Sequence, residues 1–326
     1  MNFKHLALGA ASALALGFGA SAALAANDSN VTQGGVYNNA TVTQTSATNG
    51  KSTITQSGVN VIGVPGVASV TQAGGATNTS TINQVVGSLR ASATVSQSGG
   101  SRANTASLTQ AGAGAVAEVT QASNAVGTNA SGTNSVTIGQ SGNSGGPDQN
   151  ALVSQTGDAN TVTITQSQAL SLIGTDASVT QVGYNNSATV NQVGSSSYAL
   201  VTQSGENSSI SVTQMGADNF SSSIRSGNNN SFTVNQYSNN NRSTITGQGW
   251  GGVIEVVQDL VDLNESTIKQ DGNGNTAKVT QKAASKSTSV IDQAGAINVA
   301  TVNQTVVGGV SSITQGGSYN NATVNQ

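Results

Sequence analysis

The sequence predicts an all-β protein, a β-solenoid of stacked short repeats, and three observations lead to that fold class. An apolar residue, any residue and then a glutamine recur along the chain, as in Val42-Thr43-Gln44. The residues before each glutamine alternate with period two, which is the side-chain period of a strand. Glycine, asparagine and serine, which accept turn geometry, fill the segments between these units. A regular repeat of one strand and one turn is typical of a solenoid.

The composition excludes several classes of function. Of 326 residues only 7% are charged and 3% are aromatic, and the formal net charge is -3. Such a chain is not a polybasic nucleic-acid binder, and its low charge density favours self-association. It contains no cysteine, and its single histidine is His5. Disulfide frameworks, thiolate metal sites and most nucleophilic-triad chemistry are therefore excluded, and we expect no enzyme activity, no cofactor and no metal.

Residues 1–25 have the pattern of a secretory signal peptide. Lys4 precedes an apolar stretch from Leu6 to about Phe18, and Ala23-Leu24-Ala25 forms an A-x-A cleavage pattern. The apolar run is shorter than the roughly 20 residues that cross a bilayer. We expect cleavage after Ala25, with Ala22 as the alternative site, and no insertion into a membrane. Residues 26–30 then form a short N-terminal segment before the repeats, which occupy residues 31–326.

The glutamines mark the register of the repeat. Of the 26 glutamines, 24 are assigned to such a unit, although Gln248 lacks the apolar residue two positions earlier, and Gln149 and Gln168 stand outside the pattern. Successive glutamines are most often 11 or 12 residues apart. Pro65 and Pro147 fall in long gaps between glutamines, which we interpret as inserted loops because proline cannot serve in a hydrogen-bonded ladder. Two strands of about 11 residues then form one rung of about 22 residues, with rungs about 4.8 Å apart.

The positions of the charges indicate which face of each strand is buried. We assign the faces from eight charges that lie within the five residues before a repeat glutamine, each of them an odd number of residues from that glutamine. They therefore share a face with the threonines and not with Val and Gln. Because an unpaired buried charge is costly, the Val/Gln face is predicted to be the interior. The eight charges are Lys51, Glu118, Asp176, Glu255, Glu265, Lys269, Lys278 and Asp292.

Inside a solenoid the side-chain amides of glutamine and asparagine can form their hydrogen bonds with the same residues of the neighbouring rungs. Each glutamine lies above the glutamine of the rung below, so its amide can donate to one neighbour and accept from the other. Five units follow a stricter form, Gln-x-Gly-x-x-Asn-x-Ala followed by three residues and Gln. In these units the predicted interior ladder comprises Gln33, Asn38, Ala40, Val42, Gln44, Gln181, Asn186, Ala188, Val190, Gln192, Gln270, Asn275, Ala277, Val279, Gln281, Gln293, Asn298, Ala300, Val302, Gln304, Gln315, Asn320, Ala322, Val324 and Gln326.

The strict form resembles the curlin repeat of the subunits of curli, the extracellular functional amyloid of bacterial biofilms. The resemblance covers residues 31–326, with partial matches such as the unit that begins at Gln155. It implies an extended major structural subunit, cross-β structure on assembly, and a secreted, cell-surface fibre (a curli-like pilus) that serves biofilm matrix and adhesion. It also implies export through a dedicated outer-membrane channel and polymerisation on a minor nucleator subunit.

Two features differ from the pattern of that family. Known major subunits carry a glycine-rich targeting segment before the repeats, whereas here only about Ala26 to Asn30 intervenes. The last repeat carries no charge, which differs from a nucleator with a basic terminal repeat. The second feature favours a major subunit over a nucleator.

Two other functions compete with a structural subunit. Outward Thr-x-Thr pairs such as Thr41/Thr43 would suit an ice-binding solenoid, although asparagine replaces the second threonine at Asn191, Asn303 and Asn325. A carbohydrate-processing β-helix enzyme would need clustered carboxylates on several neighbouring rungs, and the sequence has none. Ice binding therefore stays as the alternative function.

Three local features could carry chemistry, and each has a simpler interpretation. One group of acidic residues lacks the loop spacing of a calcium hand and is interpreted as a solvated patch on an imperfect rung. It consists of Glu255, Asp259, Asp262 and Glu265. Nearby lysines are interpreted as balancing this charge rather than binding nucleic acid or polysaccharide, and they are Lys269, Lys278, Lys282 and Lys286. Trp250, flanked by glycines, is interpreted as part of an irregular turn rather than a sugar-stacking site.

The two ends of the repeat region are nearly the same in sequence. Residues 33–44 and 315–326 agree at 10 of 12 positions, and neither segment carries a charge. Solenoids that stay monomeric need polar caps on their terminal repeats, and these segments supply none. We therefore expect the last rung of one subunit to stack on the first rung of the next, and such an open contact generates a filament. The repeat falters between Gly247 and Glu265, which we predict to be its least stable stretch.

Overall fold

The computed structural model divides the chain into two compact units, residues 1–174 and 175–326. The described residues form strands and turns and no helix, and each unit is a parallel β-solenoid. Together the units have about 11 turns of about 23 residues each. The predicted all-β solenoid is confirmed, while one continuous solenoid over residues 31–326 stays a prediction. The structure describes residues 13–18, 27–45, 47, 49–57, 65–74, 77–85, 90–99, 103–123, 133–142, 149–168, 174–260, 262–283 and 285–326.

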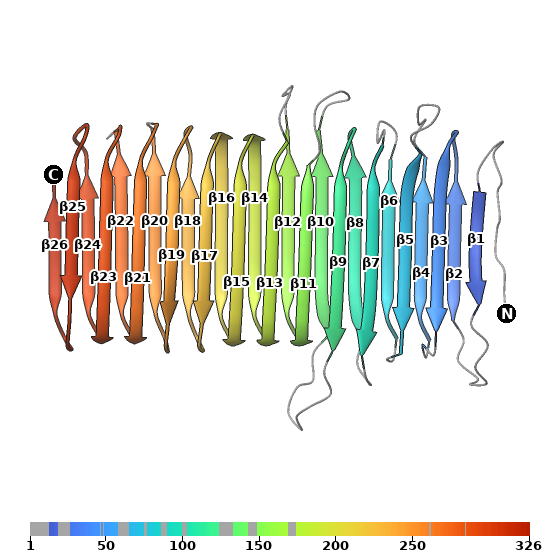
Figure 1. The fold of residues 1–326 in the computed structure, drawn as a ribbon, viewed down its shortest axis with the longest axis horizontal. Helices are drawn as coiled ribbons and strands as arrows, with labels where there is room; N and C mark the ends of the chain where they lie inside the picture. The colour runs from blue at the N-terminus through green and yellow to red at the C-terminus, as the bar shows by residue number, and fades with distance from the viewer. Residues whose placement is uncertain are drawn as a thin grey trace. The chain divides into compact units, whose positions relative to one another are not determined.

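The first unit contains two parallel sheets (Figure 1). Consecutive strands alternate between the sheets, so each strand pairs with the strand two before it in the chain. The odd-strand sheet comprises β1 (Ala13–Phe18), β3 (Asn38–Thr45), β5 (Gly66–Ala73), β7 (Ser92–Gly99), β9 (Val116–Ser123) and β11 (Asn150–Asp158). The even-strand sheet comprises β2 (Asp28–Gln33), β4 (Lys51–Gln56), β6 (Thr79–Gln84), β8 (Asn104–Ala111), β10 (Asn134–Ser141) and β12 (Thr161–Ser167).

The second unit repeats this arrangement with shorter turns. Its odd-strand sheet comprises β13 (Asp176–Tyr184), β15 (Tyr198–Glu206), β17 (Phe220–Ser226), β19 (Arg242–Gln248), β21 (Glu265–Asn273), β23 (Thr288–Ala296) and β25 (Val310–Gln315). Its even-strand sheet comprises β14 (Ser187–Ser195), β16 (Ser209–Ala217), β18 (Ser231–Gln236), β20 (Val253–Asp259), β22 (Thr276–Lys282), β24 (Val299–Gln304) and β26 (Asn321–Asn325).

The strand register places like residues opposite one another. Between β14 and β16, Val190 is opposite Val212 and Gln192 is opposite Gln214. These inward side chains are buried between the two sheets, and each buried valine or isoleucine contributes about 1.5–3 kcal/mol. A shift of one residue would turn the whole inward set to solvent, so burial fixes the register.

The length of a rung varies with the turns. In the second unit Gln192 and Gln214 are 22 residues apart, and Gln258 and Gln281 are 23 apart. In the first unit the same contact joins Gln121 to a glutamine 34 residues later, at Gln155. The predicted rung of about 22 residues is therefore slightly short, because the connections between strands differ in length.

The N-terminal part of the chain includes a strand within the predicted signal peptide. β1 pairs in parallel with β3, from Ala13 opposite Asn39 to Phe18 opposite Gln44. Ala25, the predicted cleavage site, lies outside the described residues, so cleavage there stays a prediction. Pro65 directly precedes β5, while Pro147 lies outside the described residues. Among the described residues no helix is long and apolar enough to cross a membrane.

One turn position has a left-handed backbone in successive rungs of the second unit. Asn207 and Asn229 occupy it with φ of 54° and 57°, and asparagine tolerates this conformation well. Ile297 makes the same turn hydrogen bond, from its N–H to the carbonyl of Asn273, and has φ of 57°. A β-branched side chain is strained in this conformation, and the side chain of Ile297 is exposed. The Ile297 turn is therefore strained, and because the side chain is exposed, its burial does not offset this strain.

Replacing Ile297 by asparagine should raise the free energy of unfolding by about 1 kcal/mol, because the left-handed backbone is no longer strained. Asn229→Ile, the reciprocal change at the equivalent position, should lower it by a similar amount. Urea unfolding of the soluble subunit, followed by circular dichroism, measures both. An unchanged midpoint for Ile297→Asn would contradict the assignment of strain to this turn.

Candidate functional site: the amide ladders of the core

The residues predicted to form the interior ladder line the space between the two sheets of each unit. In β22, Ala277, Val279 and Gln281 are fully buried, whereas Lys278 between them points outward. The equivalent inward residues of the strict units that begin at Gln181 and Gln293 are buried in the same way. The predicted ladder residues that are not buried are Gln44, Asn320, Ala322, Val324 and Gln326. All of these except Gln44 lie in or beside β26, on which no further described strand packs.

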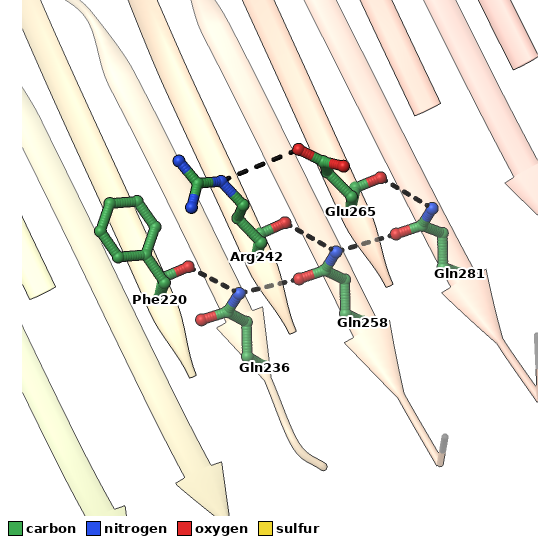
Figure 2. Close-up of polar contacts among 6 residues, drawn as sticks. All are labelled: Phe220, Gln236, Arg242, Gln258, Glu265 and Gln281. Atoms are coloured by element: carbon green, nitrogen blue, oxygen red, sulfur yellow. Dashed lines mark hydrogen bonds and ion pairs between the residues drawn. The ribbon is translucent and has the colours of Figure 1, made fainter. Parts of the chain in front are cut away.

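Within a complete ladder a buried glutamine donates in two directions, as Figure 2 shows for Gln236 and Gln258. The Nε2 of Gln236 donates to Oε1 of Gln258 at 2.9 Å, which lies in the next rung of the same sheet. It also donates to the main-chain carbonyl of Phe220 at 3.1 Å, which lies in the facing sheet. Gln258 repeats both bonds, to Gln281 at 2.9 Å and to the carbonyl of Arg242 at 3.1 Å. The amides therefore join rung to rung and sheet to sheet.

The ladders have a direction. From the bond between Gln33 and Gln56 to the bond between Gln304 and Gln326, the Nε2 of the earlier glutamine donates to Oε1 of the later one. The cross-sheet carbonyls fix this orientation, because only the NH2 end of each amide can donate to them. Each ladder consequently has an acceptor end toward the N-terminus and a donor end toward the C-terminus.

Asparagines form a second ladder at the turns. The main-chain N–H of Asn298 donates to Oδ1 of Asn275 at 2.9 Å, and the N–H of Asn320 donates to Oδ1 of Asn298 at 3.0 Å. The Nδ2 of Asn298 also donates to the carbonyl of Ala294, four residues earlier, at 3.2 Å. This side chain therefore closes its own turn and supports the turn of the next rung.

One glutamine ladder is interrupted in the odd-strand sheet of the second unit. Its column runs from Gln203 through Arg225 and Gly247 to Gln270. Arg225 is only 1% exposed, and its guanidinium extends across the space beside Gly247. It donates to the carbonyl of Gln270 at 3.1 Å and to Oδ1 of Asn230 at 2.7 Å. Gly247 is required here, because a Cβ would collide with the guanidinium and with the Gln270 carbonyl.

The interruption leaves polar atoms unsatisfied. Neither Nε2 of Gln203 nor Oε1 of Gln270 has a hydrogen-bond partner among the described residues. Burial lowers the pKa of Arg225 to about 10, and the Asp271 carboxylate partly opposes this shift. The guanidinium also lies over the ring of Phe232, 5.2 Å from its centre, which compensates in part. The buried cation replaces the missing amide only incompletely.

The structure corrects the sequence reading of this region. Gln248 was predicted to end a repeat unit, yet it lies on the outer face, opposite Ser226 and Asp271, and Gly247 occupies the ladder position. Arg225 was missed as an interior residue, although its spacing of 22 residues from Gln203 is the signal that identifies it. Gln149, outside the repeat pattern, is also buried, and its Nε2 donates to the carbonyl of Ser141 at 3.0 Å.

Two residues of the acidic patch pair with cations on neighbouring strands. Lys278 contacts Glu255 at 2.8 Å, and Arg242 contacts Glu265 at 3.8 Å. Asp262 accepts the N–H of Asn239 at 2.8 Å. The described residues contain no group of side chains that could hold a metal ion. The eight charges used to assign the faces lie outside the core, namely Lys51, Glu118, Asp176, Glu255, Glu265, Lys269, Lys278 and Asp292.

The other candidate residues lie in exposed turns or at the surface. Trp250 is exposed in the turn between β19 and β20, and its main-chain N–H donates to Oδ1 of Asn273 at 3.1 Å. Lys282 of β22 is opposite Asp259 of β20, just as Lys278 is opposite Glu255 on the same two strands. Neither Trp250 nor Lys282 lies in an arrangement of polar side chains that suggests catalysis.

Comparison with known protein families identifies the repeat. Residues 176–205 and 205–237 match the model of the curlin associated repeat. These residues include β13 to β18, where successive rungs are 22 residues long, as from Gln192 to Gln214 and from Gln214 to Gln236. A comparison with curated proteins found no similar sequence. The chain therefore contains curlin repeats, as the sequence motif predicted.

Replacing Gln192 by glutamate should abolish the stability of its rung. Glutamate has the same shape but cannot donate to the carbonyls of Asp176 and Ser197 or to Gln214 Oε1, and it places a charge in the dry core. We expect a loss of about 3 kcal/mol or more in the free energy of unfolding. Thr189→Glu, on the outer face of the same strand, should cost little. Equal losses in the two variants, measured by urea unfolding, would contradict the assignment of an inner and an outer face, and a larger loss in Thr189→Glu would mean that the faces are reversed.

The interruption at Arg225 predicts a difference in local stability between the two sheets. Amide hydrogen exchange should be faster in β17 and β19 than in β18 and β20, where the ladder from Gln236 to Gln281 is complete. This prediction moves the least stable region from residues 247–265, expected from sequence, to β17 and β19 of the odd-strand sheet. Exchange measured by mass spectrometry on the assembled protein tests it, with residues 179–214 as the slow reference. Uniform protection of both sheets would refute it.

Proposed function

We propose that the chain is a secreted structural subunit of a curli-like extracellular amyloid fibre, and that it polymerises head-to-tail in biofilm matrix and adhesion. The curlin repeats and the β-solenoid fold support a structural role rather than catalysis. The observation that carries the proposal is the open state of the last strands. Val324 and Ala322 in β26 remain partly exposed, whereas Val302 and Ala300, the equivalent residues of β24, are fully buried. An open strand edge recruits another chain.

The resemblance to curli subunits supplies the other parts of the proposal. The predicted signal peptide would take the chain out of the cytoplasm, and a dedicated outer-membrane channel would release it. A minor nucleator subunit would start the fibre at the cell surface. These partners follow from the family and not from any contact of the described residues.

The ice-binding alternative receives no support from the outer face. Ice matching requires a regular array of threonines on consecutive rungs. In the even-strand sheet of the second unit, Thr233 is opposite Glu255, and Glu255 is opposite Lys278. Two charged rungs therefore interrupt the threonine column, and the structural subunit is the better assignment.

Incubating the purified chain from residue 26 should give fibres that bind thioflavin and diffract at about 4.7–4.8 Å along the fibre axis. The same solution should show no thermal hysteresis. A chain that stays monomeric over the range of concentrations tested, or that shows thermal hysteresis without fibres, would refute the proposed function.

A proline at Thr323 should stop growth while leaving the subunit folded. The N–H of Gln326 donates to Asn303 in β24, and because main-chain groups alternate along a strand, the N–H of Thr323 points to the open edge. Thr323→Pro removes that donor without breaking the pairing with β24. Seeded assembly followed by thioflavin should show elongation lost in Thr323→Pro and retained in the control Thr323→Ala. Parental elongation rates in the proline variant would show that this edge does not take part in growth.

A further inference from the structure

The two nearly identical segments at opposite ends of the repeat region adopt the same turn. Gly35 and Gly317 have φ of 91° and 84°, and the tyrosines two residues later have φ of 57° at Tyr37 and 62° at Tyr319. In both turns an asparagine Nδ2 donates to the carbonyl four residues earlier, from Asn38 at 2.8 Å and from Asn320 at 2.7 Å. The match in sequence is therefore also a match in backbone shape, which stacking of one turn on the other requires.

These two segments lie at opposite ends of the glutamine ladders, and the hydrogen-bonding groups at the two ends are complementary. The Nε2 of Gln315 and of Gln326 each donates to a carbonyl of the facing sheet, at Val299 and Val310, both at 3.0 Å. The bond to a next glutamine, which their equivalents in earlier rungs make, is not formed by either among the described residues. At the other end Gln33 and Gln44 donate inward to the first unit, so their Oε1 atoms are the acceptor ends of the ladders. Oε1 of Gln44 also accepts from the hydroxyl of Ser29 at 3.0 Å, as Oε1 of Gln72 accepts from both Gln44 and Ser52.

The path of the chain decides which strands can meet. In the second unit every strand pairs with the strand two before it, as β26 does with β24 and β25 with β23. A further strand that continues this path must therefore pair with β25, and the one after it with β26. If the neighbouring copy begins with β2, then β2 takes the place beside β25 and β3 takes the place beside β26.

We infer that β25 pairs with β2 of a second copy of this chain, and β26 with its β3, with Gln315 opposite Gln33 and Gln326 opposite Gln44. This inference rests on the proposed function and specifies the contact by which subunits join. Along β25 the inward residues Ser311 and Ile313 are then opposite Ser29 and Val31. Along β26, Ala322 and Val324 are then opposite Ala40 and Val42. The two tyrosine-containing turns lie on the same edge, one directly above the other.

β1 determines whether this contact can form. It pairs with β3 along the edge that β26 of the neighbouring copy would occupy. A chain that kept β1 would also shift the pairing by one strand, because β1 would lie beside β25 and β2 beside β26. The matched turns would then be on opposite edges of the stack. Removal of the predicted signal peptide therefore both frees the edge of β3 and sets the strand order at the junction.

Cysteine crosslinking tests the strand order directly, because the chain has no cysteine of its own. In the inferred register Ser312 is opposite Asn30 of the next copy, whereas in the shifted register Thr323 is opposite Asn30. All three side chains are exposed. Opposite residues on neighbouring strands lie about 4.8 Å apart, within the range of Cα distances that a disulfide spans.

Fibres are grown from residues 26–326 as equal mixtures of two single-cysteine chains and then oxidised mildly. Asn30→Cys with Ser312→Cys should give disulfide-linked dimers, and so should Thr41→Cys with Thr323→Cys. Asn30→Cys with Thr323→Cys is the matched control and should give none. Dimers in the control mixture instead of the first two would overturn the inferred strand order while leaving the proposed fibre intact. If no mixture forms fibres, the proposed function fails, and the junction fails with it.

A glycine variant provides a second readout that does not depend on crosslinking. A Cβ at Gly295 would collide with the carbonyl of Gly317 in the next rung, whereas a Cβ at Gly317 meets no close atom in the subunit. In the inferred junction it would meet Gly35 of the next copy. Gly317→Ala should therefore lose seeded elongation, while Gly308→Ala, which has a similar positive φ and equally open surroundings on the opposite edge, should retain it. Elongation by Gly317→Ala at the rate of Gly308→Ala would contradict the stacking of the two turns.

Discussion

The hydrogen bonds of the buried glutamine amide are the interaction on which the rest of this structure depends. Within a complete ladder the Nε2 donates along the stack to the next glutamine and across the core to a carbonyl of the facing sheet, as Gln258 does. A buried amide that missed these partners would cost about 1–3 kcal/mol for each unmet group. The rungs must therefore repeat in register. The outer face carries no such requirement, which explains why threonine, asparagine and charged residues replace one another there.

The interruption at Arg225 shows how far this constraint can be relaxed. The guanidinium reaches past Gly247 to the carbonyl of Gln270, so the column is bridged although its two amide contacts are lost. In the same rungs the glutamine ladder of the even-strand sheet is complete, through Gln236 and Gln258. Because every rung has two ladders and the amides also connect the sheets, an imperfect residue in one column leaves the other column to maintain the register.

The direction of the ladders connects the core to assembly. A column of amides that all donate toward the C-terminus exposes donors at one end and acceptors at the other, and parallel strands have the same asymmetry in their main-chain edges. Like ends cannot satisfy each other, while unlike ends can. The function we propose therefore resides in the repeating interior and its two ends. Some of the surface charges pair with one another, as Lys278 does with Glu255 and Arg242 with Glu265.

The sequence by itself determined the strands, their inward faces and the glutamine ladders, because period-two alternation and the cost of buried charge act within one strand and need no knowledge of its neighbours. The similarity of residues 33–44 and 315–326 was equally visible. Only the tertiary structure decided which residues face the core in the strands that break the apolar-x-Gln pattern. Arg225 lies inside and Gln248 outside because pairing with the neighbouring strands sets the register of β17 and β19. The sequence pattern assigns the faces of a strand only by counting back from the glutamine in that strand. The alternation of strands between two sheets likewise comes from the path of the chain, and it determines which edges are available to a second copy.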